Sequence, residues 1–265
     1  MSKIKLYWCR GHGHSDVNQR NFGDYLSADL VEIFSGRNVV FADIKHADMI
    51  AIGSVLGREK KAKNWGIKHK LHVWGTGSGN RDDVFSPRHY YHAVRGLKCK
   101  EQIQGLKDQP LMGDPGLLSP WLVKPQGKKI SVGIIPHLSH QNSPQITALL
   151  TRIPKSKLID VYSPVKQVLE EISSCDFVLS SSLHGLIVAD AYGVPNQWLT
   201  LERNSDWEFK FEDYYSSFGL FDQVPVTPIE ILQSASWSFE DYMNAYRRPG
   251  IEALQEGLIA AFPQM

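Results

Sequence analysis

Short apolar runs alternate along the chain with stretches in which apolar residues recur at helical spacing. The clearest helical stretch of the first half is 24–34, where Leu26, Leu30 and Phe34 share one face. The apolar runs predict strands at 3–8, 38–44, 48–54, 70–76, 90–96, 129–135, 157–162, 177–182 and 196–201, and further helices lie near 144–153, 165–174 and 184–192. Strands alternating with helices are typical of βα units, so the pattern predicts an α/β fold built on parallel sheets.

The alternation occurs twice, and proline and glycine interrupt it once, in the segment 117–129. We therefore expect two Rossmann-like domains: residues 1–120 on the acceptor side of a cleft and residues 121–235 on its donor side. Residues 236–265 are predicted to form helices that pack back on the first domain.

Composition excludes several classes of protein. Apolar residues make up 42% of the chain and charged residues 22%, which is typical of a globular protein rather than a disordered or fibrous one. The net charge of +1 indicates no nucleic-acid partner. The three cysteines are far apart and form neither a zinc motif nor a disulfide framework. With no signal peptide and no apolar stretch of membrane-spanning length, we expect a cytoplasmic protein.

The segment 173–195 is the most informative part of the chain, because a buried strand runs through three serines into a helix that opens near His184. Free amide groups and the positive end of the helix dipole favour an anion at such a place, and the hydroxyls of Ser181 and Ser182 add hydrogen-bond donors. The alternative is structural, with Ser182 capping the helix and His184 filling space. We favour a phosphate or carboxylate ligand here.

Several motifs in this order resemble those of the polysaccharide pyruvyl transferase family. The resemblance covers about residues 20–215 and rests on Asn21–Asp24, Ile52–Leu56, Trp74–Gly79, Val94–Gly96, Gly113–Gly116, Asp176–Ile187 and Phe209–Tyr214. One departure is Ser182, which stands where many members have arginine. The resemblance implies a GT-B-like fold, in which two Rossmann-like domains face a cleft, and phosphoenolpyruvate as the donor substrate, with neither a metal nor a further cofactor.

The resemblance also implies site residues. His184 is the family histidine, which donates a proton or stabilises the phosphate. Asp24 is expected to act as a base or to bind a sugar hydroxyl, with helix capping as the alternative. Donor-binding residues are Ser181, Ser182, Arg95, His137 and Lys210, and acceptor-binding residues are Asn21, Gly23 and Trp74. Trp207 is a further aromatic candidate for stacking on a sugar.

Two polar features have competing interpretations. His12 and His14 could indicate a metal, but no further ligand completes a recognisable spacing, and a polar loop is favoured. The basic run of Arg58, Lys60, Lys61, Lys63, Lys68 and Lys70 is either a solvated face or a contact with a lipid-linked acceptor or the anionic inner membrane surface.

The expected function is transfer of pyruvyl from phosphoenolpyruvate to a sugar of a polysaccharide or lipid-linked oligosaccharide. The product would be a pyruvate ketal in exopolysaccharide or cell-surface glycan biosynthesis. Two alternatives remain: a nucleotide-sugar glycosyltransferase of the same fold, and an inactive glycan-binding subunit, which the serine at position 182 would fit.

Overall fold

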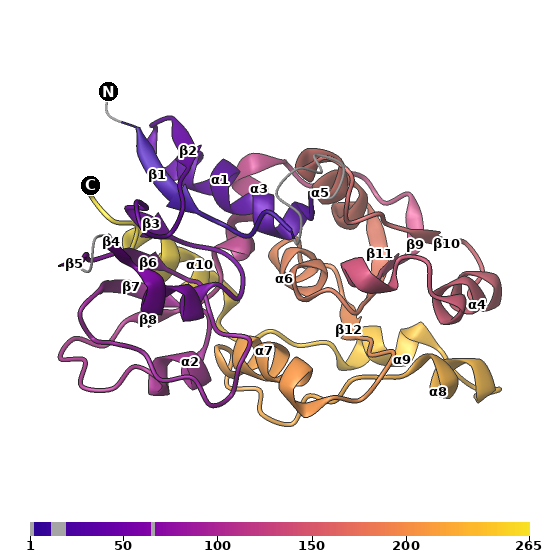
Figure 1. The fold of residues 1–265 in the computed structure, drawn as a ribbon. Helices are drawn as coiled ribbons and strands as arrows, with labels where there is room; N and C mark the ends of the chain where they lie inside the picture. The colour runs from indigo at the N-terminus through magenta and orange to yellow at the C-terminus, as the bar shows by residue number, and fades with distance from the viewer. Residues whose placement is uncertain (1–2, 12–19, 65–66) are drawn as a thin grey trace.

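The computed structural model describes residues 3–11, 20–64 and 67–265. Two parallel sheets lie side by side, and both chain ends lie at the first of them (Figure 1). His12 and His14, for which a polar loop is predicted, lie outside the described residues.

The first sheet has six parallel strands in the order β2-β1-β3-β6-β7-β8. Their bounds are β1 (Ile4–Tyr7), β2 (Val39–Phe41), β3 (Met49–Ile50), β6 (His72–Trp74), β7 (Tyr90–Val94) and β8 (Leu111–Met112). Alternation sets the orientation of β1: Ile4 and Leu6 are buried, whereas Lys5 between them is exposed. Leu6 pairs with Met49 of β3, which places one apolar row against the helices of the same half.

Helix α1 (Phe22–Ser35) connects the two halves of the molecule. The side chain of Asn21 caps its start by accepting a hydrogen bond from the amide of Gly23. Its buried face belongs to an apolar cluster that also contains residues of the second half, such as Leu186 and Trp198. The remaining elements of the first half are short: η1 (Leu56–Lys61), the hairpin of β4 (Lys63–Asn64) and β5 (Ile67–Lys68), α2 (Leu97–Glu101), η2 (Pro115–Leu118) and α3 (Ser119–Leu122).

The second sheet has four parallel strands in the order β10-β9-β11-β12. Their bounds are β9 (Ile130–Ile135), β10 (Ser156–Leu158), β11 (Cys175–Ser180) and β12 (Asn196–Trp198). The helical segments of this half are η3 (Leu138–His140), α4 (Pro144–Arg152), α5 (Val165–Ser173), α6 (Leu183–Ala191), α7 (Ser205–Ser216), α8 (Pro228–Gln233) and α9 (Phe239–Ala245). β11 is buried along most of its length and leads through Ser181 and Ser182 into α6, which is buried on nearly all sides.

The end of the chain crosses from the second half to the first. A buried carboxylate, Asp190 at the end of α6, accepts hydrogen bonds from the side chains of Tyr246 (2.8 Å) and Arg248 (2.8 Å). Beyond these residues, α10 (Ile251–Ala260) packs against β8 and η2. The last part of the chain therefore spans both halves.

The expected α/β class is confirmed, since both sheets are parallel and alternate with helices. The GT-B arrangement and the boundaries 1–120, 121–235 and 236–265 stay predictions. The strand expected at 157–162 is shorter than predicted, because the chain turns at Asp160, whose side chain accepts a hydrogen bond from the amide of Tyr162 (2.9 Å). The carbonyl of Val161 then accepts from the amide of Phe22 (2.8 Å), at the start of α1.

Candidate functional site

The starts of α1 and α6 meet face to face. A Cβ atom built on Gly23 would lie 2.1 Å from Nδ1 of His184, so the imidazole ring rests directly on the glycine backbone. Only glycine leaves this space. Gly23 is buried beneath His184 in this structure, and its expected contact with the acceptor stays a prediction.

Asp24 follows Gly23 and lies against the loop after β3, where a Cβ on Gly53 would be 3.4 Å from Oδ1 of Asp24. Burial raises the pKa of Asp24 to about 7, although the charge of Lys210 and a hydrogen bond from Asn21 oppose the rise. Both protonation states of this carboxyl are therefore populated near neutral pH. The capping alternative for Asp24 is wrong, because Asn21 is the residue that caps α1. Acceptor binding by Asn21 stays a prediction.

His184 is 7% exposed, and its Nε2 atom is buried without a hydrogen-bond partner among the described residues. Burial lowers the pKa of His184 to about 3, and the positive charges of Arg95 and Lys210 add to the effect. The ring is therefore neutral at physiological pH. It can exchange hydrogen bonds with a ligand, but it is not an imidazolium acid in this state.

Lys210 extends from α7 into the same region. Burial and the charge of Arg95 lower the pKa of Lys210 to about 8, against the opposing effect of Asp24. Its Nζ atom lies 3.9 Å from the centre of the Trp207 ring, a cation–π distance. Its charge also helps to lower the pKa values of His184 and His137, so the amine acts on both rings.

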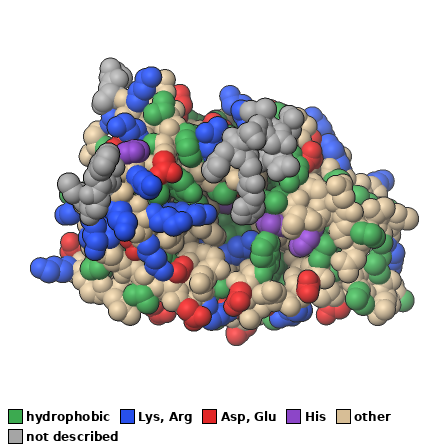
Figure 2. Space-filling view, in the orientation of Figure 1, with side chains coloured by type: hydrophobic (Ala, Val, Ile, Leu, Met, Phe, Trp, Pro, Cys, Tyr) green, Lys and Arg blue, Asp and Glu red, His purple; other side chains and the backbone are tan. Residues whose placement is uncertain are grey.

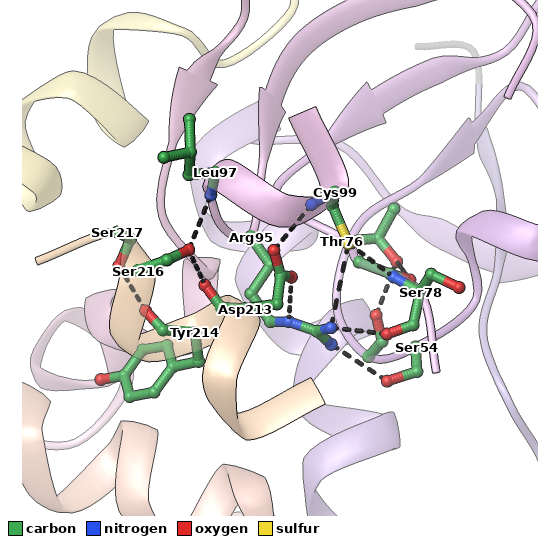
Figure 3. A network of polar contacts seen from close by, with 12 residues as sticks. Ser54, Thr76, Ser78, Arg95, Leu97, Cys99, Asp213, Tyr214, Ser216 and Ser217 are labelled. Carbon is green, nitrogen blue, oxygen red and sulfur yellow. Dashed lines mark hydrogen bonds and ion pairs between the residues drawn. The ribbon is translucent and has the colours of Figure 1, made fainter. Parts of the chain in front are cut away.

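Arg95 is completely buried at the end of β7 (Figure 3). Its Nε donates to Asp213 Oδ2 (2.8 Å), one Nη to Ser54 Oγ (3.0 Å) and the other to the carbonyl of Ser78 (2.6 Å). In this structure the guanidinium is bound by protein groups, and direct donor binding by Arg95 stays a prediction. Its charge acts from behind the site, where it lowers the pKa values of His184 and Lys210.

Trp74 is also completely buried. Its indole donates to the carbonyl of Leu258 in α10 (2.9 Å), and its ring packs edge-on against Phe34 and Phe262. Trp74 therefore joins the last helix to the first sheet in this structure, and its contact with the acceptor stays a prediction.

The serines between β11 and α6 form a hydrogen bond with the segment that follows β9. Ser181 Oγ accepts a hydrogen bond from the amide of His137 (2.9 Å), which follows β9. The amide of Ser182 donates to Ser180 Oγ (3.0 Å), and the hydroxyl of Ser182 makes no capping bond to α6. The alternative that the Ser182 side chain caps α6 is therefore wrong. Donor binding by Ser181, Ser182 and His137 stays a prediction.

Two cavities adjoin these side chains. The larger, about 340 Å³, is lined by Ser54, Gly79, Asn204, Asp206, Trp207 and Lys210, and the smaller, about 140 Å³, by Ser139, His140, Ser181, Thr200, Leu201, Glu202, Asn204 and Trp207. The ring of His137 packs edge-on against Trp207, with 4.5 Å between the ring centres. Both cavities are lined in part by Asn204 and Trp207. Figure 2 shows a hollow in the middle of this face with histidine and basic side chains around it.

Sequence reasoning did not single out Ser54 or Asp213 as site residues. The available signals were weak: Ser54 follows a glycine at the end of the strand predicted over 48–54, and Asp213 lies in the family-like segment Phe209–Tyr214, where no role was assigned to it. Within the described ranges, no group of three or more His, Cys, Asp or Glu side chains is placed to hold a metal ion.

Residues 21–201 match the family described as polysaccharide pyruvyl transferase, and the chain belongs to this family. This confirms the resemblance found in the motifs. The chain is 26% identical over 220 residues to "Succinoglycan biosynthesis protein ExoV" of Rhizobium meliloti (strain 1021), covering 81% of this chain and 64% of that protein.

A second relative is an uncharacterized protein, L143, of Acanthamoeba polyphaga mimivirus, which is 31% identical over 144 residues. That match covers 49% of this chain and 48% of the relative, so the chain spans less than two thirds of the length of either protein. A crystal structure of an uncharacterized Klebsiella pneumoniae protein is similar with a TM-score of 0.49 and 12% identity, covering 84% of this chain and 93% of the other. None of the helices in the described part of the chain is long and apolar enough to cross a membrane.

Proposed function

We propose that this protein transfers pyruvyl from phosphoenolpyruvate to two hydroxyls of a sugar, forming a cyclic ketal on a polysaccharide or a lipid-linked oligosaccharide. Membership of the family supports a pyruvyl transferase in general. The observation that carries the particular chemistry is the meeting of Asp24, His184 and Lys210 where two helices begin. Together they offer a carboxyl that titrates near neutrality, a neutral imidazole and a cation.

The reaction needs an acid, a base and a site for anions. Protonation of the methylene carbon leaves positive charge on the adjacent carbon, to which the first hydroxyl adds with loss of its proton. The bond from that carbon to the phosphate oxygen then breaks, and phosphate leaves with the electron pair. The second hydroxyl then adds to the same carbon, closes the ketal and loses its proton. Of the two protons that the hydroxyls lose, one replaces the proton added to the methylene carbon and the other leaves with phosphate.

Asp24 suits the proton transfers better than His184. A carboxyl with a pKa of about 7 is present in both forms at neutral pH, so it can give a proton to the methylene carbon and take one from a hydroxyl. A histidine with a pKa of about 3 has no proton of this kind to give. We assign His184 to hydrogen bonding with the donor through its unpaired Nε2 atom, and Lys210 to the charge of the donor's phosphate or carboxylate.

The test is incubation with phosphoenolpyruvate and a panel of aryl glycosides, followed by mass spectrometry of the glycosides and measurement of released phosphate. Pyruvyl addition with an equal amount of phosphate is expected. Asp24→Asn should lower turnover by about 100-fold or more, as is usual for the loss of a general acid–base group. Glu32→Gln, which changes an exposed carboxyl on the same helix, is the matched control.

Two results would contradict the proposal. Turnover of a nucleotide sugar without phosphoenolpyruvate would indicate a glycosyltransferase. Glycan binding with no phosphate release from phosphoenolpyruvate would indicate an inactive binding subunit.

A further inference from the structure

The loop after β3 holds Ser54 at the wall of the larger cavity, opposite α7. Gly53 has a φ of +94°, a conformation that glycine adopts without strain, and its carbonyl accepts hydrogen bonds from the Thr76 hydroxyl (2.6 Å) and the Gly77 amide (3.0 Å). These bonds fix the loop on the first sheet. Ser54 itself is exposed and lines the cavity together with Lys210.

The hydrogen bond from Arg95 determines what the Ser54 hydroxyl can do. A guanidinium has donors only, so Ser54 Oγ is the acceptor of this 3.0 Å bond and its own proton must point elsewhere. No described residue accepts a hydrogen bond from Ser54 Oγ, whereas the cavity is open beside it. The charged donor also polarises the hydroxyl, which makes it a stronger donor.

Arg95 is held rigidly enough to fix this geometry. Asp213 Oδ2 accepts from Nε of Arg95 (2.8 Å), while Asp213 Oδ1 accepts from the amide of Cys99 (2.8 Å) (Figure 3). Asp213 lies one turn after Lys210 on α7. The same buried ion pair therefore orients both Ser54 and the helix that carries Lys210, one on each side of the cavity.

We propose that Ser54 is a ligand-binding residue whose hydroxyl donates a hydrogen bond to an anionic oxygen, held between Ser54 and Lys210. Phosphate and carboxylate oxygens share the required chemistry. Asp206, the acidic residue of the lining, lies on the exposed first turn of α7. Identifying the anion as phosphoenolpyruvate rests on the proposed function, whereas anion binding by Ser54 does not.

The experiment is calorimetric titration of the whole protein with inorganic phosphate and, separately, with phosphoenolpyruvate. Ser54→Ala should weaken binding about 10- to 100-fold, the usual effect of losing a hydrogen bond to a charged group. Ser54→Thr keeps the hydroxyl and should bind within a few fold of the wild type. Ser236→Ala, an exposed serine with no side-chain hydrogen bond in the described structure, is the matched control.

A second measurement separates binding from folding, since Ser54→Ala also removes one partner of the buried Arg95. The Michaelis constant for phosphoenolpyruvate should rise in Ser54→Ala, while that for the sugar stays unchanged. The assignment of Ser54 would be overturned if wild type and Ser54→Ala bound the anions with equal affinity while Lys210→Met bound them more weakly. It would also be overturned if the wild type bound neither phosphate nor phosphoenolpyruvate. Binding of phosphate but not phosphoenolpyruvate, still weakened by Ser54→Ala, would support this assignment and count against the proposed donor.

Discussion

Gly23 shows how a single position controls the site. Adding one methyl group at this glycine forces the ring of His184 to move, because the new Cβ would be 2.1 Å from Nδ1. We expect Gly23→Ala to destabilise the protein by about 1–3 kcal/mol, the usual cost of overpacking, and to abolish most transfer activity. Urea unfolding and the phosphate-release assay measure the two effects. Gly127→Ala, where a Cβ meets nothing within 4 Å, should change neither stability nor activity. If Gly23→Ala is as stable and as active as the wild type, the close contact between Gly23 and His184 is refuted.

The carboxyl of Asp24 should make stability depend on pH. Its pKa is about 7 in the folded protein and about 3.8 for an aspartate exposed to water, so between these values the folded state binds more protons than the unfolded state. Stability contributed by the protonated group is present below pH 3.8 and is lost as pH rises toward 7. The free energy of unfolding of Asp24→Asn minus that of the wild type should therefore rise across this window, by at most about 1.4 kcal/mol per pH unit. Urea titrations at several pH values test this, and a difference that does not change with pH would contradict the raised pKa.

Helix α7 is attached to the first half of the molecule by side-chain bonds. It follows the second sheet in sequence, yet Asp213 pairs with Arg95 of the first sheet, and Ser216 Oγ accepts a hydrogen bond from the amide of Leu97 (2.9 Å). A Cβ on Gly96 would collide with the backbone of Asp213, which shows how closely the two elements approach. The position of Lys210 thus depends on contacts made one turn later on its own helix.

Asp213→Asn should therefore be strongly destabilising, by about 3–5 kcal/mol, because it leaves the charge of Arg95 buried without its counter-ion. Denaturant unfolding measures the loss. Asp241→Asn, in the first turn of the exposed helix α9, is the control. A loss below about 1 kcal/mol in Asp213→Asn would mean that the ion pair does not hold α7 in place.

Charge is distributed unevenly over the whole molecule. Six cations and Glu59 give the segment 58–70 a charge of +5, so the rest of a chain with a total of +1 carries −4. Glu59 is buried and paired with His89, whereas the six cations are exposed, and basic side chains gather on the side of Figure 2 where β4 and β5 lie. The 3-10 helix η1 starts two residues after Ser54, so this basic surface adjoins the larger cavity.

We expect the basic surface to bind vesicles that contain anionic lipid, weakly and only at low salt. Reversing Lys61, Lys63 and Lys68 to glutamate should weaken binding at least about 100-fold, since each lysine contributes about 1 kcal/mol near an anionic surface and each glutamate adds repulsion. The same change at the exposed Lys107, Lys124 and Lys129 is the matched control. Vesicle flotation measures the binding of both triple variants. If the wild type does not bind at low salt, the basic run is only a solvated face.

Local patterns were enough to predict the elements and the family. Alternating apolar runs and helical spacing depend on neighbours a few residues apart, and the strands near 3–8, 129–135 and 177–182 and the helices near 144–153 and 165–174 formed close to where they were expected. The order of short glycine and polar motifs was likewise readable without a structure, and the family match confirms what it indicated.

The roles of individual side chains depended on contacts between distant parts of the chain. Arg95 and Asp213 are 118 residues apart, and Trp74 and Leu258 are 184 apart, so no local spacing could show that Arg95 and Trp74 are buried with these partners. The same holds for Asp24 and His184, whose pKa values follow from burial and from the charge of Lys210 on a third element. The sequence by itself determined which elements form and which chemistry is present, whereas tertiary packing decided which of those groups face the ligand, because burial and charge are properties of the space around a side chain.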